Sequence, residues 1–328
     1  MLDKLLLEDG RLRPFIRFLV SVLGILAVAM VTGLVALTLP VRFVPLPPQL
    51  AQIFWFNLLL LPALLAFYAL LARLLERRPL GSVGLAFHPR WKNELVMGLA
   101  AGTAMILAVA GAEGLLGVAQ FSLGSASAGR IALAGALLFL LLAAAAASEE
   151  LIFRGYPFQR LVDVGGPVFA VIALSVLFGA AHLRNPFHNW ISTLNTAVVG
   201  VLLAICYLRT RALWLPLGIH FSWNFVQGYG AGLPVSGVSF PEPILQAKVS
   251  GPLWLTGGAY GPEGSILTLG VIAVGTVYFF VSRRVFMTTE MQALALGPGN
   301  GAETPLSRGT ASRSRNASHG APEASKRG

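Results

Sequence analysis

Residues 131–155 read IALAGALLFLLLAAAAASEELIFRG, and this stretch decides how the rest of the chain is interpreted. Its first seventeen residues, Ile131 to Ala147, contain nothing more polar than glycine. A helix needs about 20 apolar residues to cross the hydrocarbon core of a bilayer. Glu149, Glu150 and Arg154 follow directly, although charged side chains are costly in lipid. The stretch therefore predicts a membrane helix whose ionisable residues have a function or a partner.

The composition of the whole chain indicates the same class of protein. Of its 328 residues 55% are hydrophobic and only 12% are charged, and the mean hydropathy is +0.73. A soluble domain carries about 25% charged residues. Lipid offers no hydrogen bonds to the backbone, so long apolar runs must form helices or closed barrels. The chain is expected to be an all-α, polytopic membrane helical bundle.

We expect about eight transmembrane helices, at approximately 15–39, 52–74, 95–118, 131–153, 167–182, 190–208, 212–229 and 264–282. These divide the chain into a cytoplasmic N-terminal segment (1–14), a transmembrane bundle (15–287) with a core at about 131–229, and a basic C-terminal tail (288–328). The tail is predicted to be disordered, because from Gly297 onward it holds Gly, Ser, Ala and charges without apolar periodicity. Glu263 is expected to cap the last helix, since acids favour helix N-termini.

The basic residues predict the orientation. With the N-terminus inside, the inner segments hold 20 of the 24 Lys and Arg residues, and the outer segments hold only Arg42, Arg130, Arg184 and Lys248. By the positive-inside rule both termini are then cytoplasmic. The basic residues form no face with aromatic side chains, so nucleic acid is not an expected partner. The excess of Arg over Lys suggests a high-GC bacterium, and we expect an integral protein of the bacterial cytoplasmic membrane.

Polar residues inside or at the ends of three predicted spans are difficult to explain by packing alone. Glu150 and Arg154 are four residues apart, so an ion pair on one helical face accounts for both. Glu149 is rotated by about 100° from Glu150 and has no such local partner. His182 ends the next span and, by itself, fits a satisfied residue at a helix end.

His220 and Asn224 again share a helical face, where they are able to join helices by hydrogen bonds. Helical rise suggests a further relation among these groups. Counted from a turn near Gly165, Glu149 and His182 both lie about 25 Å away, and His220 and Asn224 climb about 14–20 Å from a turn at 209–211 on the same side of the membrane. The residues therefore predict a polar pocket within the bilayer.

Glutamate and histidine can take a proton from water, and histidine and asparagine can donate hydrogen bonds to an oxyanion. Glu149, His182 and His220 are equally suited to ligating a divalent metal, most plausibly zinc, which would make a bound water nucleophilic. The sequence contains neither HExxH nor GxSxG, and its one cysteine, Cys206, cannot form a thiol pair. The residues alone leave the metal-free and the metal-assisted alternatives open.

Three motifs in this order resemble a known family. EELIFRG matches a Glu-Glu-x-x-x-Arg signature, FGAAH a Phe-x-x-x-His signature and HFSWN a His-x-x-x-Asn signature. Together, over about 139–229, they resemble the CPBP family of intramembrane metalloproteases, which includes type II CAAX prenyl endopeptidases and bacteriocin-processing Abi proteins. LTGGAYGPEGS, before the last predicted span, also looks like bacterial members.

The resemblance implies that Glu149 and His182 activate the attacking water and that His220 and Asn224 stabilise the oxyanion. It implies that Glu150 and Arg154 brace the site or position the substrate. The expected function is then an intramembrane endopeptidase that cleaves a membrane-associated, lipidated or secreted peptide. Two alternatives are a proton-coupled transporter and a non-catalytic immunity or scaffold protein. A transporter would favour internal repeats, and none is evident between the two halves.

Overall fold

A computed structural model describes residues 7–8 and 11–296, and its main elements are helices. The long helices are α2 (Pro14–Thr38), α3 (Pro48–Leu71), α4 (Trp91–Leu115), α5 (Ala128–Arg154), α6 (Tyr156–Ala181), α7 (Trp190–Thr210), α8 (Trp214–Phe225) and α10 (Ile266–Val281). Two π-helical segments, η2 (Ala72–Glu76) and η5 (Val226–Gly230), extend α3 and α8.

The short elements lie in the connections between the long helices. They comprise the 3-10 turns η1 (Val41–Phe43), η3 (Leu80–Val83), η4 (His182–Arg184), η6 (Gly258–Tyr260) and η7 (Pro262–Gly264), and the helices α9 (Leu253–Thr256) and α11 (Thr289–Leu296). The strands β1 (Leu7–Glu8) and β2 (Arg11–Leu12) form one antiparallel pair. A second antiparallel pair joins β3 (Ala119–Leu123) to β4 (Leu245–Val249), with Phe121 opposite Ala247.

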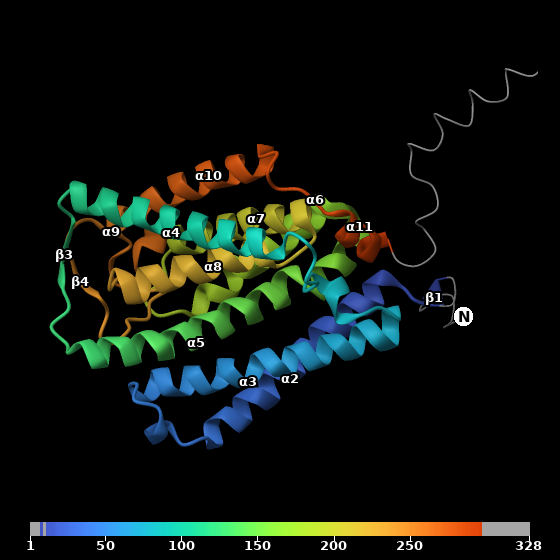
Figure 1. The fold of residues 1–328 in the computed structure, drawn as a ribbon, viewed down its shortest axis with the longest axis horizontal. Coiled ribbons are helices and arrows are strands. Elements are labelled where there is room, and N and C mark those ends of the chain that lie inside the picture. Colours follow the sequence, from blue (N-terminus) through green and yellow to red (C-terminus); the bar gives the residue numbers. More distant parts are fainter. Residues whose placement is uncertain (1–6, 9–10, 297–328) are drawn as a thin grey trace, which may run out of the picture.

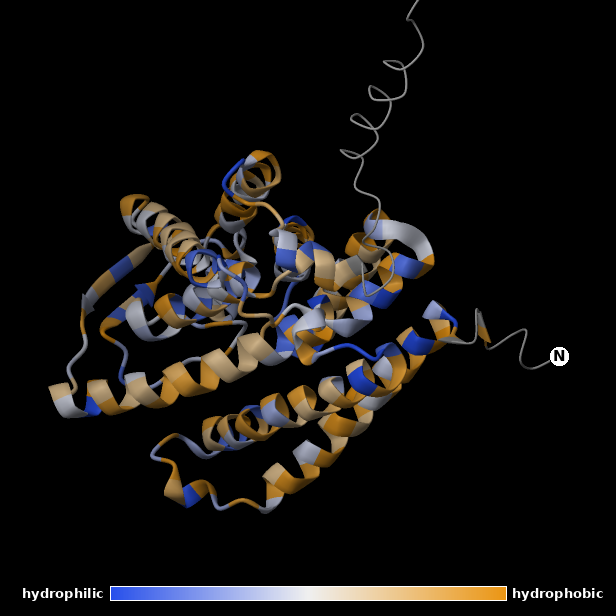
Figure 2. Cartoon of the chain, turned by 45° about the vertical axis from the view of Figure 1, so that its right-hand side comes forward, coloured by the Kyte–Doolittle hydropathy of each residue, from blue (hydrophilic) through white to orange (hydrophobic). Residues whose placement is uncertain are grey.

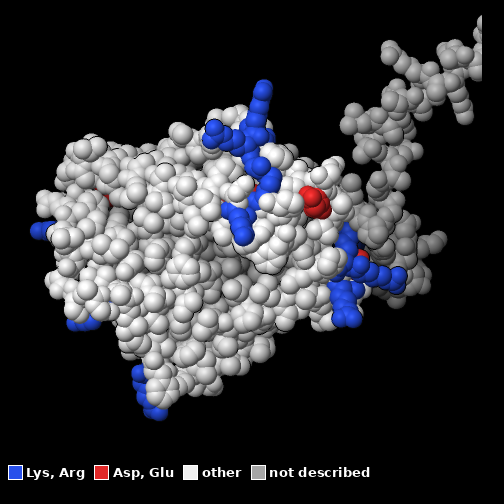
Figure 3. All heavy atoms as spheres, in the orientation of Figure 1, with Lys and Arg blue, Asp and Glu red and all other residues white. Residues whose placement is uncertain are grey.

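The long helices run roughly alongside one another, and successive helices cross the bundle in opposite directions (Figure 1). One end of the bundle carries β1, the start of α2 and α11, whereas β3, β4 and α9 lie at the other end (Figure 1). Arg42, Arg130, Arg184 and Lys248 belong to the second end, which we call the β3–β4 end. In the space-filling view, Lys and Arg side chains gather near the α11 end, and only separate ones appear at the β3–β4 end (Figure 3).

The outer surface of the bundle is apolar, as expected of a protein embedded in lipid. The faces of α2, α3 and α5 are mainly hydrophobic in Figure 2. On α2, the side chains of Leu23, Met30 and Leu37 are each more than 60% exposed. Water would penalise such a surface, whereas hydrocarbon does not. The chain is an integral membrane protein with an all-α polytopic bundle, which confirms the predicted fold class.

The helices that are able to span a membrane do not correspond one to one with the eight predicted spans. Within the described residues, five helical stretches are long and apolar enough to cross a membrane, and one of them, Ala128–Arg184, combines α5, α6 and η4. The chain breaks between α5 and α6 at Gly155, and it is non-helical again at Gly166, where φ is +83°. The hairpin between these spans therefore has two breaks, and not the single turn near Gly165 that the sequence suggested. The prediction of eight spans stays a prediction.

Two predictions about the C-terminal third are wrong. The segment predicted to be disordered from residue 288 begins with α11, whose first turn is held by hydrogen bonds from Met291 N to Thr288 Oγ1 and from Gln292 N to Thr288 O. The buried Met291 anchors this helix. The rest of that segment, 297–328, lies outside the described residues. The cap of α10 is Ser265, which accepts a hydrogen bond from Thr268 N, and not Glu263.

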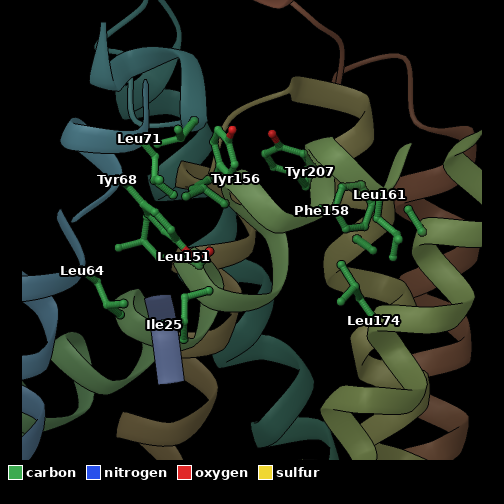
Figure 4. Packing of buried hydrophobic residues seen from close by; sticks show 14 of the residues in the cluster. Ile25, Leu64, Tyr68, Leu71, Leu151, Tyr156, Phe158, Leu161, Leu174 and Tyr207 are labelled. Carbon is green, nitrogen blue, oxygen red and sulfur yellow. Dashed lines mark hydrogen bonds between the residues drawn. The ribbon is translucent and has the colours of Figure 1, made fainter. Parts of the chain in front are cut away.

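A buried cluster holds the end of α5 that carries the two glutamates. Leu151 of α5 packs with Leu64 and Tyr68 of α3 and with Tyr156 of α6 (Figure 4). The Tyr68 hydroxyl donates a hydrogen bond to the Leu151 carbonyl at 3.0 Å, and the Tyr68 and Tyr156 rings stack at 6.4 Å. Deeply buried apolar contacts of this kind fix the rotation of a helix about its axis.

Glycines bring α8 close to α4. A Cβ atom added at Gly218 would lie 2.6 Å from the Leu95 carbonyl oxygen and 2.9 Å from Leu99 N. Added at Gly98, it would collide with the Leu215 carbonyl oxygen. Small residues at such crossings allow backbones in membranes to approach closely. This contact sets the position of α8, which carries His220 and Asn224.

Candidate active site

A cavity of about 520 Å³ lies inside the bundle. It is lined by side chains from α3, α5, α6, α7, α8 and α10 and by the loops at the β3–β4 end. Glu149, His182, His220 and Asn224, the four residues predicted to be catalytic, all line it. Residues from three separate helical regions therefore meet in one chamber, which is the arrangement expected of a ligand or active site.

The carboxylate of Glu149 faces both histidines. Its Oε2 atom lies 3.7 Å from His220 Nε2 and 4.0 Å from His182 Nε2. This oxygen is buried and has no hydrogen-bond partner in the protein. A buried acceptor needs a donor, and a water molecule or a substrate group would supply one.

Each histidine is oriented by a hydrogen bond at its other ring nitrogen. His182 Nδ1 lies 2.7 Å from the Phe178 carbonyl oxygen, which only accepts, so Nδ1 carries a hydrogen. His220 Nδ1 lies 2.8 Å from Glu150 Oε1, which in its ionised form also only accepts. In the neutral rings the free lone pair is then on Nε2 in both residues. Both lone pairs are on the nitrogen that is nearer to Glu149.

Glu150 and Arg154 form the ion pair that their spacing predicted, and the pair is completely buried. Arg154 Nη1 lies 3.1 Å from Glu150 Oε1, and the two side chains are 2% and 1% exposed. Arg154 also donates to the Gly200 carbonyl at 3.2 Å and lies over the Phe178 ring at 4.5 Å. Since Glu150 Oε1 contacts both Arg154 and His220, the pair joins α5 to the ring that faces Glu149.

The contact between Glu150 and His220 could not be predicted from the sequence, because the two residues are 70 positions apart. Reasoning from helical spacing finds only neighbours within the same helix, and for Glu150 it found only the ion pair with Arg154. Asn224 lies one turn after His220 on α8 and lines the same cavity, as the shared face suggested. The predicted roles of these residues remain hypotheses.

Glu263 also lies in the cavity, although the sequence analysis expected it to cap the last helix. Glu263 of η7 lines the cavity and accepts hydrogen bonds from Ser236 N at 2.6 Å and from Gln227 Nε2 at 3.0 Å. Burial raises the pKa of Glu263 to about 7, and these hydrogen bonds oppose the rise only in part. The PEG sequence within a Gly-rich loop was the available signal, but a turn glutamate of this kind is usually solvated.

The residues proposed as metal ligands suit zinc in chemical type. Glu, His and His are common zinc ligands, and both rings have the second hydrogen bond that such ligands have. However, among residues 7–8 and 11–296 no group of three or more His, Cys, Asp or Glu side chains is placed to hold a metal ion. The prediction of zinc stays a prediction, and the chemistry below uses only the chain's own residues.

Comparison with known proteins supports the resemblance seen in the motifs. Residues 131–226 match the family of type II CAAX prenyl endopeptidases described as Rce1-like. The match runs from the fourth residue of α5 to the first residue of η5 and includes all six predicted site residues. It supports an intramembrane protease of the CAAX type at the level of the family. No curated protein and no solved structure gave a match to the chain.

Proposed function

We propose, from the Rce1-like domain at 131–226 and the geometry of its cavity, that the chain hydrolyses a peptide bond within or beside the membrane. The observation that carries the proposal is the position of Glu149. Its carboxylate lies in a cavity large enough for a peptide segment and faces the Nε2 atoms of His182 and His220. Such a carboxylate is suited to removing a proton from water.

In the proposed reaction, water lies between Glu149 and the scissile carbonyl. The carboxylate takes one proton as the water oxygen bonds to the carbonyl carbon, and the carbonyl π electrons move to oxygen. His182, whose Nδ1–H is held by the Phe178 carbonyl, accepts the second O–H of the water at Nε2. This hydrogen bond orients a water lone pair toward the carbon.

The oxyanion then needs hydrogen-bond donors. Asn224 is able to donate from its amide, and His220 from Nε2–H when its ring carries both protons. Glu150 supports that form of His220, because its carboxylate accepts the Nδ1–H hydrogen bond. Donors already in place at such an oxyanion contribute about 10²–10³ in rate. When the C–N bond breaks, Glu149 returns its proton to the leaving amine.

The surroundings of the cavity suggest the kind of substrate. One side is apolar, with Leu50, Ile53 and Phe56 of α3 and Leu141 of α5. The other side contains loop residues of the β3–β4 end, among them Ser236 and Glu263. If both termini are cytoplasmic, as the basic residues predict, this end is on the outer side of the membrane. We propose a lipidated or secreted peptide precursor as the substrate.

Mass spectrometry of cleavage products tests the proposal. The purified chain, in vesicles, is incubated in H₂¹⁸O with a pool of peptides that contain an apolar segment. The expected result is cleavage at defined bonds, with one ¹⁸O atom in each new carboxyl group. If the folded protein in vesicles cleaves none of the peptides, and no intact membrane-anchored precursor either, the proposed function is contradicted.

A further inference from the structure

Glu263 is a carboxyl group in the cavity that the proposed reaction does not use. Its hydrogen-bond donors are Ser236 N at 2.6 Å, Gln227 Nε2 at 3.0 Å and Ser236 Oγ at 3.2 Å. Its backbone carbonyl accepts from Asn195 Nδ2 at 2.8 Å. These contacts fix the side chain at the wall of the cavity, because they come from α7, η5 and the loop around Ser236.

None of these donors carries a positive charge. Within residues 7–8 and 11–296, no salt bridge includes Glu263, and no Lys or Arg lines the cavity. The other two carboxylates of the site differ in this respect, because Glu150 pairs with Arg154 and Glu149 faces two histidines. A partly buried carboxylate without an ion-pair partner of its own is unfavourable, and a cationic ligand would compensate its charge.

The residues near Glu263 add hydrogen-bond acceptors to this part of the cavity. The wall here is neutral and polar, with Asn185, Asn195, Thr196 and Ser236. Asn195 is 1% exposed, and its Nδ2 donates hydrogen bonds to the carbonyls of Glu263 and Ser265. Its Oδ1 atom has no hydrogen-bond partner in the protein. Gln227, which is fully buried, likewise has an Oε1 atom without a partner.

One titratable base of the cavity interacts with Glu263 but is already hydrogen-bonded to another carboxylate. His220 lines the same cavity and favours the ionised form of Glu263, and its Nδ1 is bound to Glu150. The phenol of Tyr260 also lies near Glu263 and brings no positive charge. An incoming carboxylate would therefore meet one acid and several acceptors here, whereas an ammonium or guanidinium group would meet complementary partners.

We infer that Glu263, with Asn195 and Asn185, forms a subsite that binds a cationic group of the substrate, either a Lys or Arg side chain or a free N-terminal ammonium. The inference rests on the proposed peptidase function and names the substrate class for it. Glu149 and Glu263 line one cavity, so a peptide with its scissile bond at Glu149 reaches Glu263 with a group near that bond.

Three peptide pools test the subsite. Their sequences are randomised, except that one fixed position near the centre is Lys in the first pool, Gln in the second and Glu in the third. The wild type is expected to cleave the Lys pool about tenfold faster than the Gln pool, because a hydrogen bond between charged groups is stronger than one between neutral groups. The Glu pool is expected to be the slowest.

Substitutions then test whether Glu263 causes the preference for the Lys pool. Glu263→Gln is expected to reduce the Lys preference to less than about twofold, while cleavage of the Gln pool stays within about threefold of wild type. Asn185→Asp adds a carboxylate to the same wall and is expected to increase the preference. Glu242→Gln is the matched control, since Glu242 pairs with Arg130 outside this cavity and is expected to leave the preference unchanged.

A binding measurement separates this inference from the peptidase function. Fluorescent versions of the pools are titrated against Glu149→Gln and against Glu149→Gln/Glu263→Gln. If cleavage fails but the Lys pool binds about tenfold tighter only when Glu263 is present, the subsite is supported and the peptidase function is not. A Lys preference that is absent from wild type, or one that persists in Glu263→Gln and does not increase in Asn185→Asp, would overturn the subsite.

Discussion

The buried pair of Arg154 and Glu150 gives a quantitative prediction for stability. Arg154→Met keeps the length and removes the charge, so Glu150 loses its cationic partner while it stays buried at 1% exposure. Removing one member of a buried ion pair costs about 3–5 kcal/mol. The loss of the hydrogen bond to the Gly200 carbonyl acts in the same direction. We expect Arg154→Met to lower the free energy of unfolding by about 3–5 kcal/mol.

Two double variants separate the effect of the ion pair on protein stability from its effect on the position of the His220 ring. In Glu150→Gln/Arg154→Met no charge is left unpaired, and the amide oxygen of Gln is still able to accept from His220 Nδ1. In Glu150→Leu/Arg154→Met the acceptor is lost as well. Replacing a buried pair by apolar residues is often neutral for stability. Both double variants should therefore regain most of the lost stability, but only the Gln variant should keep measurable peptidase activity.

The assay is denaturant unfolding in detergent, followed by tryptophan fluorescence, with peptide cleavage measured on the same preparations. Arg130→Met is the control, because Arg130 is 70% exposed and its ion pair with Glu242 is at the surface. Such pairs are worth about 0–1 kcal/mol. If Arg154→Met unfolds within about 1 kcal/mol of wild type, the ion pair does not stabilise the bundle as reasoned here.

Three further predictions concern packing, pH and metal. Gly218→Ala should destabilise the protein by about 1–3 kcal/mol, because the added Cβ would lie 2.6 Å from the Leu95 carbonyl oxygen. Gly111→Ala on α4 is the control, because a Cβ added there meets nothing within 4 Å. Equal stability of the two variants would contradict the close-packing account. The raised pKa of Glu263, about 7 against a usual value near 4.5, means that the folded state holds its proton more tightly than the unfolded state. Stability should therefore fall by on the order of 2–3 kcal/mol as pH rises from about 4.5 to 7, and unfolding curves of Glu263→Gln should lack this component; an identical pH dependence in both proteins would refute it. Because the proposed reaction uses only the chain's own residues, cleavage should persist in chelator; activity that is lost in chelator and restored by zinc would refute the metal-free form of the reaction.

Much of the site could be predicted from local sequence, because it depends on helical periodicity. The Glu150–Arg154 pair and the shared face of His220 and Asn224 follow from a spacing of four residues. The meeting of Glu149 with His182 was also predicted, although by a hairpin with one turn near Gly165. The chain in fact breaks at Gly155 and again at Gly166. The two side chains nevertheless come within 4.0 Å of each other.

Features that depend on contacts between distant segments could not be predicted in this way. The hydrogen bond from His220 to Glu150 depends on how α8 packs against α5, and that packing depends on the glycine contact between α8 and α4. The burial of Glu263 depends on a loop fold that no periodic pattern encodes. The helix α11 was missed because its sequence, TEMQALAL, is short and its stability comes from tertiary contacts such as those of Met291.

The central claim is that the Glu149 carboxylate removes a proton from the attacking water, and one comparison of cleavage rates tests it most directly. Glu149→Gln preserves the shape of the side chain and removes its basicity, while Glu242→Gln makes the same change outside the cavity. With equal unfolding stability verified, the first variant should lose about 10²–10⁴ in kcat and the second should retain wild-type activity. Cleavage by Glu149→Gln at a rate within about threefold of wild type would contradict the account.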